Sequence, residues 1–279
     1  MTFIQKIDGD FDFSKVTLTD DFMFSKVMRD KEFCKPFLET ILEMKIKEIN
    51  YPESQKTIDI GLDAKAVRLD IYADDGEGTV YNIEMQQSRF RDVPKRSRYY
   101  QGIIDINILE KGETYHKLPN SLIIFVCTED FFGLDLPIYR FKYMCTKAPE
   151  LFLNDGTEKI FVNINTSKIN QLTPRQRSVY NYLKDEVTSD EYTQRLHQKV
   201  QDVRQNKEWR REYMTLEMML DEKREEGLEQ GLEQGTIITN LKYYYKGKIS
   251  KEEIMEELSI DEEKFEEYLK EYPKEELLK

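Results

Sequence analysis

Two short segments in the first third of the chain alternate between apolar and polar residues, which predicts a pair of β-strands. The first, VRLDIY at 67–72, places Asp70 on its polar side, and the second, YNIEMQ at 81–86, places Glu84 and Gln86 there. A turn rich in Asp, Gly and Glu at 74–78 separates them and is typical of a hairpin connection. We therefore expect Asp70, Glu84 and Gln86 to meet on one polar face of neighbouring strands.

The pattern around these strands predicts helices before them and more strands after them. Helical spacing predicts one helix that begins after a cap at Thr19 and a second at 36–44, and 46–51 is expected to form an initial strand. A buried helix at 95–111 and a continuous apolar strand, SLIIFVC at 121–127, follow. Further strands are expected at 138–143 and 160–164. This order predicts an α/β fold in which a mixed sheet is flanked by helices.

Beyond residue 172 the chain is helical and has no strand pattern. Charged segments up to residue 223 predict a helical arm that packs on the core or on a partner. The repeat EEGLEQGLEQG at 225–235 spaces its glycines by four residues, which fits a stripe along one side of a helix. A flexible hinge is the alternative, because each glycine costs a helix about 1 kcal/mol. We expect four parts: a core at 1–172, the arm at 173–223, a glycine-repeat hinge at 224–235 and a small helical unit at 236–279.

The last part is expected to hold two short helices, capped by Ser250 and Asp261. Two helices joined in this way are similar to a helix-turn-helix. The second helix reads EEKFEEYLKE, which is too acidic for a major groove. A protein contact, including a homodimer formed through the C-terminal helices, or a simple helical cap is therefore favoured over DNA reading.

The expected polar face carries candidate metal chemistry. Two carboxylates from neighbouring strands, a main-chain carbonyl and water form the all-oxygen site that Mg²⁺ or Mn²⁺ prefers. A metal there would activate water against a phosphodiester. Spacing alone leaves a second interpretation open, because the solvent-facing side of a strand often carries acidic residues.

Long stretches of the chain resemble a known family. The segments VRLDIYADDGEGTVYNIEMQQ at 67–87 and PKRSRYYQGIIDINILEKGETYHKLPNSLIIFVC at 94–127 resemble the bacterial recombination-promoting nuclease and transposase family of the PD-(D/E)XK nuclease superfamily. The likeness begins at DDFMFSKVMRD, continues through LPIYRF and DGTEKIFVN, and reaches the glycine repeat. It covers most of the chain and implies a PD-(D/E)XK nuclease-like fold with a helical C-terminal extension.

The resemblance implies a metal-dependent DNA endonuclease. The superfamily motif has an acid on one strand, then an acid, a spacer and a lysine on the next, and these positions are Asp70, Glu84, Met85 and Gln86. Asp70, Glu84 and the main-chain carbonyl of Met85 would hold Mg²⁺ or Mn²⁺, and Gln86 would position the water. Gln86 at the lysine position is a substitution that this family also shows. An amide orients water by hydrogen bonds but does not offset developing negative charge as an ammonium does.

The resemblance also implies contacts with DNA. The expected nucleic-acid-binding residues are Arg68, Arg96, Arg98, Tyr99 and Gln101. Arg98 and Gln101 would share a helix face toward the scissile phosphate. Tyr99 would stack on a base or pack within the protein.

Asp21, in the first helix, is a further candidate residue. Its carboxylate would lie near the metal, since many relatives in the superfamily use a helix acid there. An interaction with the helix dipole is the alternative interpretation.

The net charge of −12 argues against a nucleic-acid enzyme, because phosphate binding draws on a basic surface. The charge is uneven, however. The segment 89–98 carries five basic residues and one acid, whereas 221–234 carries six acids and two basic residues. A local basic strip beside the site predicts weak, salt-sensitive DNA binding. The competing hypothesis is a noncatalytic DNA- or protein-binding module that keeps the fold, favoured by Gln86 and the acidic surface.

Composition excludes other classes of protein. Three cysteines at unrelated spacings and two histidines do not match a familiar zinc pattern, so Cys34, Cys127 and Cys145 are expected to be buried thiols. A charged fraction of 34% predicts a soluble protein, and no segment is apolar for long enough to cross a bilayer. The N-terminal residues lack the pattern of a secretory signal, so a cytoplasmic location is expected.

Overall fold

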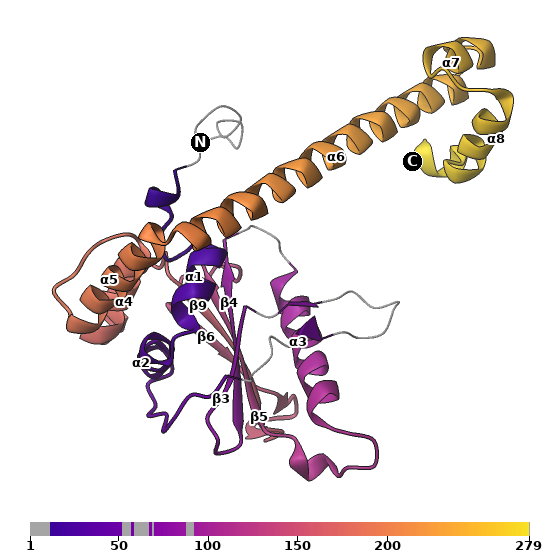
Figure 1. The fold of residues 1–279 in the computed structure, drawn as a ribbon. Coiled ribbons are helices and arrows are strands. Elements are labelled where there is room, and N and C mark those ends of the chain that lie inside the picture. Colours follow the sequence, from indigo (N-terminus) through magenta and orange to yellow (C-terminus); the bar gives the residue numbers. More distant parts are fainter. Residues whose placement is uncertain (1–11, 52–56, 59–66, 69, 88–91, 279) are drawn as a thin grey trace. The chain divides into compact units, whose positions relative to one another are not determined.

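The computed structural model describes residues 12–51, 57–58, 67–68, 70–87 and 92–278 (Figure 1). The chain forms two compact units, Met1–Arg210 and Arg211–Lys279. The first unit carries a five-stranded mixed sheet with the strand order β3-β4-β5-β9-β6. Its strands are β3 Ile71–Asp74, β4 Thr79–Gln86, β5 Asn120–Cys127, β6 Ile138–Phe141 and β9 Thr157–Asn163.

The centre of the sheet is parallel and its edges are antiparallel. β4, β5 and β9 run parallel, and β3 and β6 pair antiparallel with β4 and β9. β5 is buried along its length after Asn120, as its continuous apolar sequence predicted. Two smaller two-stranded sheets are formed by β1 Thr57–Ile58 with β2 Val67–Arg68, and by β7 Met144–Cys145 with β8 Ala148–Phe152.

Helices cover both faces of the main sheet, which confirms the expected α/β fold (Figure 1). Helix α3, Val93–Ile108, lies on one face over a core that includes Ile123, Phe125 and Phe161. On the other face are α1 Asp21–Met28, α2 Lys31–Leu42, α4 Pro174–Leu183 and α5 Glu191–Gln205. Single turns of 3₁₀ helix lie at Phe13–Lys15, Tyr115–Lys117 and Ile169–Gln171.

Helix α5 is tied to the N-terminal helices by hydrogen bonds and an ion pair. The Tyr192 hydroxyl donates to the Phe33 carbonyl at 2.7 Å, and the Lys199 ammonium lies 2.8 Å from the Asp30 carboxylate. The Arg204 Nε donates to the Val16 carbonyl at 2.9 Å. The helices that follow residue 173 therefore pack on the sheet-bearing unit up to Gln205.

Several expected boundaries were wrong, each for a local reason. The cap of α1 is Asp20, whose carboxylate accepts from the amides of Phe22 and Met23, in place of Thr19. The segment 46–51 forms no strand beyond a single bridge between Asn50 and Asp74. The hairpin β7–β8 was not expected, because its short strands are mostly exposed and do not alternate.

The second unit is helical and has its own small core. It contains most of α6, Lys207–Tyr245, followed by α7 Lys251–Glu257, α8 Glu262–Glu271 and α9 Lys274–Leu277. Ser250 and Asp261 cap α7 and α8, as predicted. The buried residues of its core are Ile237, Leu241, Ile254 and Phe265. Within the described ranges of the whole chain, no helix is both long and apolar enough to cross a membrane.

Helix α6 runs through the glycine repeat without a break, which agrees with the helical-stripe alternative for this segment. The compact units meet at residues 210 and 211, inside the expected arm. The finer boundaries at 172, 223 and 235 remain predictions.

The continuous helix gives a prediction for Gly231. A Cβ built at Gly227, Gly231 or Gly235 meets nothing within 4 Å, so alanine fits without a clash. Gly231→Ala should increase helix content and stabilise α6 by about 1 kcal/mol, measured by circular dichroism and thermal melting. The matched control is Gly247→Ala, which should destabilise because Gly247 has a φ of +65°. Unchanged or lower helix content in Gly231→Ala would instead support a hinge.

Candidate active site

The first site residue, Asp70, lies in a break between two strands. The alternation at 67–72 predicted one strand, but β2 ends at Arg68 and pairs with β1, and β3 begins at Ile71. Asp70 occupies the bend between them. Because Ile71 pairs with Ile83, the register still brings Asp70 opposite Glu84. The Arg68 side chain lies outside the described residues, so its DNA contact remains a prediction.

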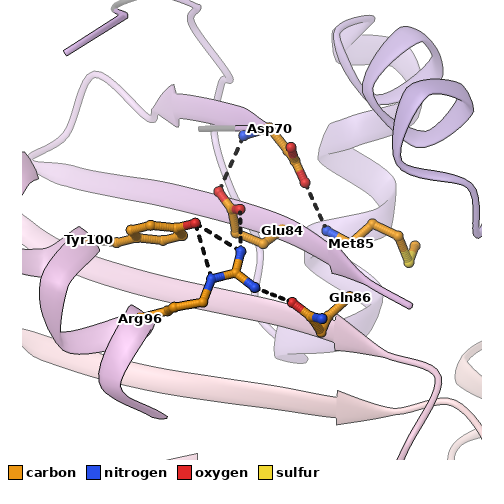
Figure 2. Close-up of polar contacts among 6 residues, drawn as sticks. All are labelled: Asp70, Glu84, Met85, Gln86, Arg96 and Tyr100. Carbon is orange, nitrogen blue, oxygen red and sulfur yellow. Dashed lines mark hydrogen bonds and ion pairs between the residues drawn. The ribbon is translucent and has the colours of Figure 1, made fainter. Parts of the chain in front are cut away.

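Hydrogen bonds join Asp70 to β4 at two points (Figure 2). The Asp70 amide donates to Oε1 of Glu84 at 3.2 Å, and the Met85 amide donates to Oδ2 of Asp70 at 3.1 Å. In a strand, the N–H and C=O of one residue point to the same side. The Met85 carbonyl therefore faces the same edge as the two carboxylates, and three oxygen-bearing groups converge there.

The polar face of β4 is buried rather than wet. Glu84 is 2% exposed and Gln86 4%, because α3 covers this face of the sheet. The interpretation of these residues as ordinary solvent-facing polar positions is thus wrong. Burial and the nearby negative charge of Asp70 raise the pKa of Glu84 well above its usual range.

Asp21, at the start of α1, belongs to the same electrostatic environment. Desolvation by the surrounding protein, followed by repulsion from Asp70, raises its pKa to about 7. The residue is nevertheless exposed, so water reaches it and reduces the effect of burial. The direction of the shift agrees with a third acid near the pair.

The donors at this edge match a hard cation that keeps part of its water shell. Among the described residues, no three His, Cys, Asp or Glu side chains lie close enough to hold a metal ion together. The set on this edge is two carboxylates and one main-chain carbonyl. Mg²⁺ is commonly held by one or two carboxylates while it retains several waters, so the residues present fit it.

A permanent cation from α3 lies beside these acids. One terminal nitrogen of Arg96 lies 3.8 Å from Oε2 of Glu84, and the other donates to Oε1 of Gln86 (Figure 2). The Tyr100 hydroxyl accepts from Nε and Nη2 of Arg96, at 3.3 and 2.8 Å. The guanidinium also lies 5.5 Å from the ring centroid of Phe125. Gln86, at the motif's lysine position, thus contacts an arginine from the next helix.

The other residues of α3 point elsewhere. Arg98 is exposed, whereas Gln101 is buried and donates to Asp105 at 2.9 Å. Tyr99 is exposed on the helix surface. The contact between Tyr100 and Arg96 was not predicted from the sequence, although their spacing of four residues places the two on one helix face. The DNA-binding roles of Arg98, Tyr99 and Gln101 remain predictions.

The three cysteines differ in their burial. Cys34 and Cys127 are buried, and burial raises the pKa of the Cys34 thiol to about 11. Cys145 is exposed in β7, so the expectation that all three thiols are buried was wrong.

The sheet, the helices on both faces and the two acids at the β3–β4 edge define a protein of the PD-(D/E)XK nuclease-like class. A family model described as "PD-(D/E)XK nuclease family transposase" matches residues 19–235. The chain belongs to this family, and its membership supports a nuclease-like function. Comparisons with curated proteins and with solved structures gave no match.

Proposed function

We propose that the protein is a metal-dependent DNA endonuclease that hydrolyses phosphodiester bonds and acts in DNA recombination. The observation that carries the proposal is the convergence of Asp70, Glu84 and the Met85 carbonyl at one edge, next to the Arg96 guanidinium. The raised pKa of Glu84 supports it, because two neighbouring acids form a site that a cation stabilises. Family membership supports the same class of reaction.

Each residue has a distinct role in this proposal. Asp70, Glu84 and the Met85 carbonyl would hold Mg²⁺ or Mn²⁺. A bound metal of this kind acts as a Lewis acid and provides a water with a lowered pKa. The Gln86 amide orients that water, and Arg96 offsets the negative charge that develops on the phosphate. Tyr100 is a positioning residue, because its hydroxyl holds the guanidinium of Arg96.

Plasmid nicking tests the proposal. The purified protein should nick supercoiled DNA in Mg²⁺ or Mn²⁺ and should not do so in EDTA. Asp70→Asn is the matched control, since it keeps the size of the side chain and the acceptor for the Met85 amide but removes the charge. Equal nicking by wild type and Asp70→Asn would contradict the site.

A noncatalytic DNA- or protein-binding module is the second candidate. The specific observation that favours it is Gln86, which replaces the ammonium of the superfamily motif by an amide. A wild-type protein that binds DNA but does not nick it with either metal would support this alternative.

A further inference from the structure

A second concave site lies on the same unit, beside the first turns of α3. It has a volume of about 290 Å³. Four aromatic side chains and two lysines line most of it: Phe132, Phe141, Tyr143, Phe161, Lys142 and Lys159. Pro94 and Ser97 of α3 complete the wall. We call this site the aromatic–lysine pocket.

The rings of the aromatic–lysine pocket are open to a ligand. Tyr143 is 52% exposed and Phe141 is 43% exposed, so other side chains leave much of their surface uncovered. Phe132 packs at 4.9 Å from Phe141 and 5.0 Å from Phe161, measured between ring centroids. These contacts fix the floor of the pocket and leave Tyr143 at its rim.

The charge of the aromatic–lysine pocket is positive. Among the described residues that line it, the charged ones are Lys142 and Lys159. The Lys159 ammonium lies 5.0 Å from the centre of the Tyr143 ring, and Lys142 lies 3.5 Å from Glu158. An anion bound near Lys159 would therefore lie beside the exposed ring of Tyr143. The pocket is positive although the net charge of the protein is −12.

A row of aromatic rings connects this pocket with the candidate active site. Tyr100, which holds Arg96, stacks on Phe125 at 6.0 Å, and Phe125 stacks on Phe161 at 5.6 Å. Phe161 then lines the aromatic–lysine pocket. The row runs from Tyr100 on α3 through Phe125 on β5 to Phe161 on β9. The two sites themselves lie on β4 and β6, which are three strand spacings apart, or roughly 14 Å, and this corresponds to about four base steps of a DNA strand. Both sites are thus within reach of one bound strand.

We propose that the aromatic–lysine pocket binds an unpaired nucleobase of the DNA strand whose backbone reaches Arg96. The base stacks on Tyr143 and Phe141, and Lys142 and Lys159 contact the adjacent phosphates. An apolar peptide side chain would not pair with the charge of the two ammonium groups, and a free phosphate would not stack on the aromatic rings. A nucleotide matches both parts. The inference rests on the proposed function in taking DNA as the substrate.

Binding of two strands with the same number of phosphates tests this inference. One is a labelled twelve-residue thymidine strand, and the other is a twelve-residue strand of abasic sites. Fluorescence anisotropy in EDTA at low salt keeps cleavage out of the measurement. Wild type should bind the thymidine strand roughly tenfold more tightly, because stacking adds to the phosphate contacts. Tyr143→Ala should lose most of this preference, and Lys142→Gln combined with Lys159→Gln should weaken the binding of both strands.

Tyr115→Ala is the matched control, since Tyr115 is 82% exposed and does not line the pocket. It should keep the full preference. Phe141→Ala is a second probe of stacking, and thermal melting checks that each variant is folded. Equal binding of the two strands by wild type, including no binding of either, would overturn the inference, as would a full preference in Tyr143→Ala and Phe141→Ala.

The outcome is separable from that of the proposed function. If the wild type nicks plasmid but shows no base preference, the base-binding role of the pocket is contradicted and the proposed nuclease activity is supported. A wild type that prefers the thymidine strand but never nicks DNA keeps the pocket and rejects the nuclease.

Discussion

Arg96→Gln is expected to lower metal-dependent nicking by about two to three orders of magnitude, the usual cost of removing a preorganised group that stabilises transition-state charge. Arg96 is a cation observed next to both Glu84 and Gln86, and the two hydrogen bonds that it donates to the Tyr100 hydroxyl hold it in place. Glutamine retains donors but carries no charge. Initial rates of plasmid nicking at saturating Mg²⁺ measure the effect.

A second substitution distinguishes the charge from the shape of the site. If Arg96 supplies the cation that the motif's lysine usually supplies, Gln86→Lys should restore part of the activity of Arg96→Gln. In the chain that retains Arg96, Gln86→Lys should preserve the nicking rate or raise it by up to about tenfold, or 1.4 kcal/mol of barrier, and Gln86→Ala should lower it.

Arg98→Gln serves as the control on the same helix. Arg98 is exposed, so its loss should weaken DNA binding mainly at low salt and leave the nicking rate at saturating DNA near the wild-type rate. If Arg98→Gln lowered the nicking rate as much as Arg96→Gln, the loss would come from the reduced positive charge of the helix as a whole. In that case Arg96 would have no special role.

The pairing of Asp70 with Glu84 could be predicted from the sequence because strand alternation and a short turn restrict the register. The break in the strand at Asp70 did not alter the outcome, since Ile71 and Ile83 still pair. Burial could not be predicted in the same way. Alternation assigns Glu84 to a face but does not say what covers that face, and here α3 covers it.

The exposed position of Arg98 has a simple geometric cause. Side chains two residues apart on a helix lie about 200° apart around its axis, so a helix that turns Arg96 toward β4 turns Arg98 away. The sequence alone does not distinguish Arg96 from Arg98 as the arginine that reaches the candidate active site. The packing of α3 on the sheet, which buries Tyr100 against Phe125 together with Ile103 and Ile104, fixes the rotation that turns Arg96 toward β4.

The glycine repeat shows why composition alone left two structures open. Glycine disfavours a helix through the entropy of the unfolded chain, which predicts a hinge. The flanking residues are strong helix formers, and α6 continues through all three glycines. The free-energy cost of the glycines is smaller than the stabilisation that the flanking helix formers provide.

Divalent metal is expected to stabilise the wild-type protein strongly, and this stabilisation should depend on both acids. At a Mn²⁺ concentration 100 times the dissociation constant, linkage gives about 2.7 kcal/mol, or a rise in melting temperature of roughly 5 to 10 °C for a unit of this size. Asp70→Ala and Glu84→Gln should lose most of the rise. Glu158→Gln, which alters a buried glutamate on β9, should keep it.

Without metal, the sign of the Glu84→Gln effect is expected to reverse. The folded protein raises the pKa of Glu84 above the usual 4.5, so its stabilising contribution is present at low pH and is lost as the pH rises through the raised value. Asp21 contributes in the same direction between pH 3.8 and about 7. Wild-type protein in EDTA should therefore melt at a lower temperature as the pH rises over this window, and Glu84→Gln should show a smaller decline and a higher melting temperature at neutral pH. A variant that is less stable than wild type in EDTA at neutral pH would mean that the ion pair with Arg96 outweighs the repulsion from Asp70, and the case for a cation-binding pair of acids would fail.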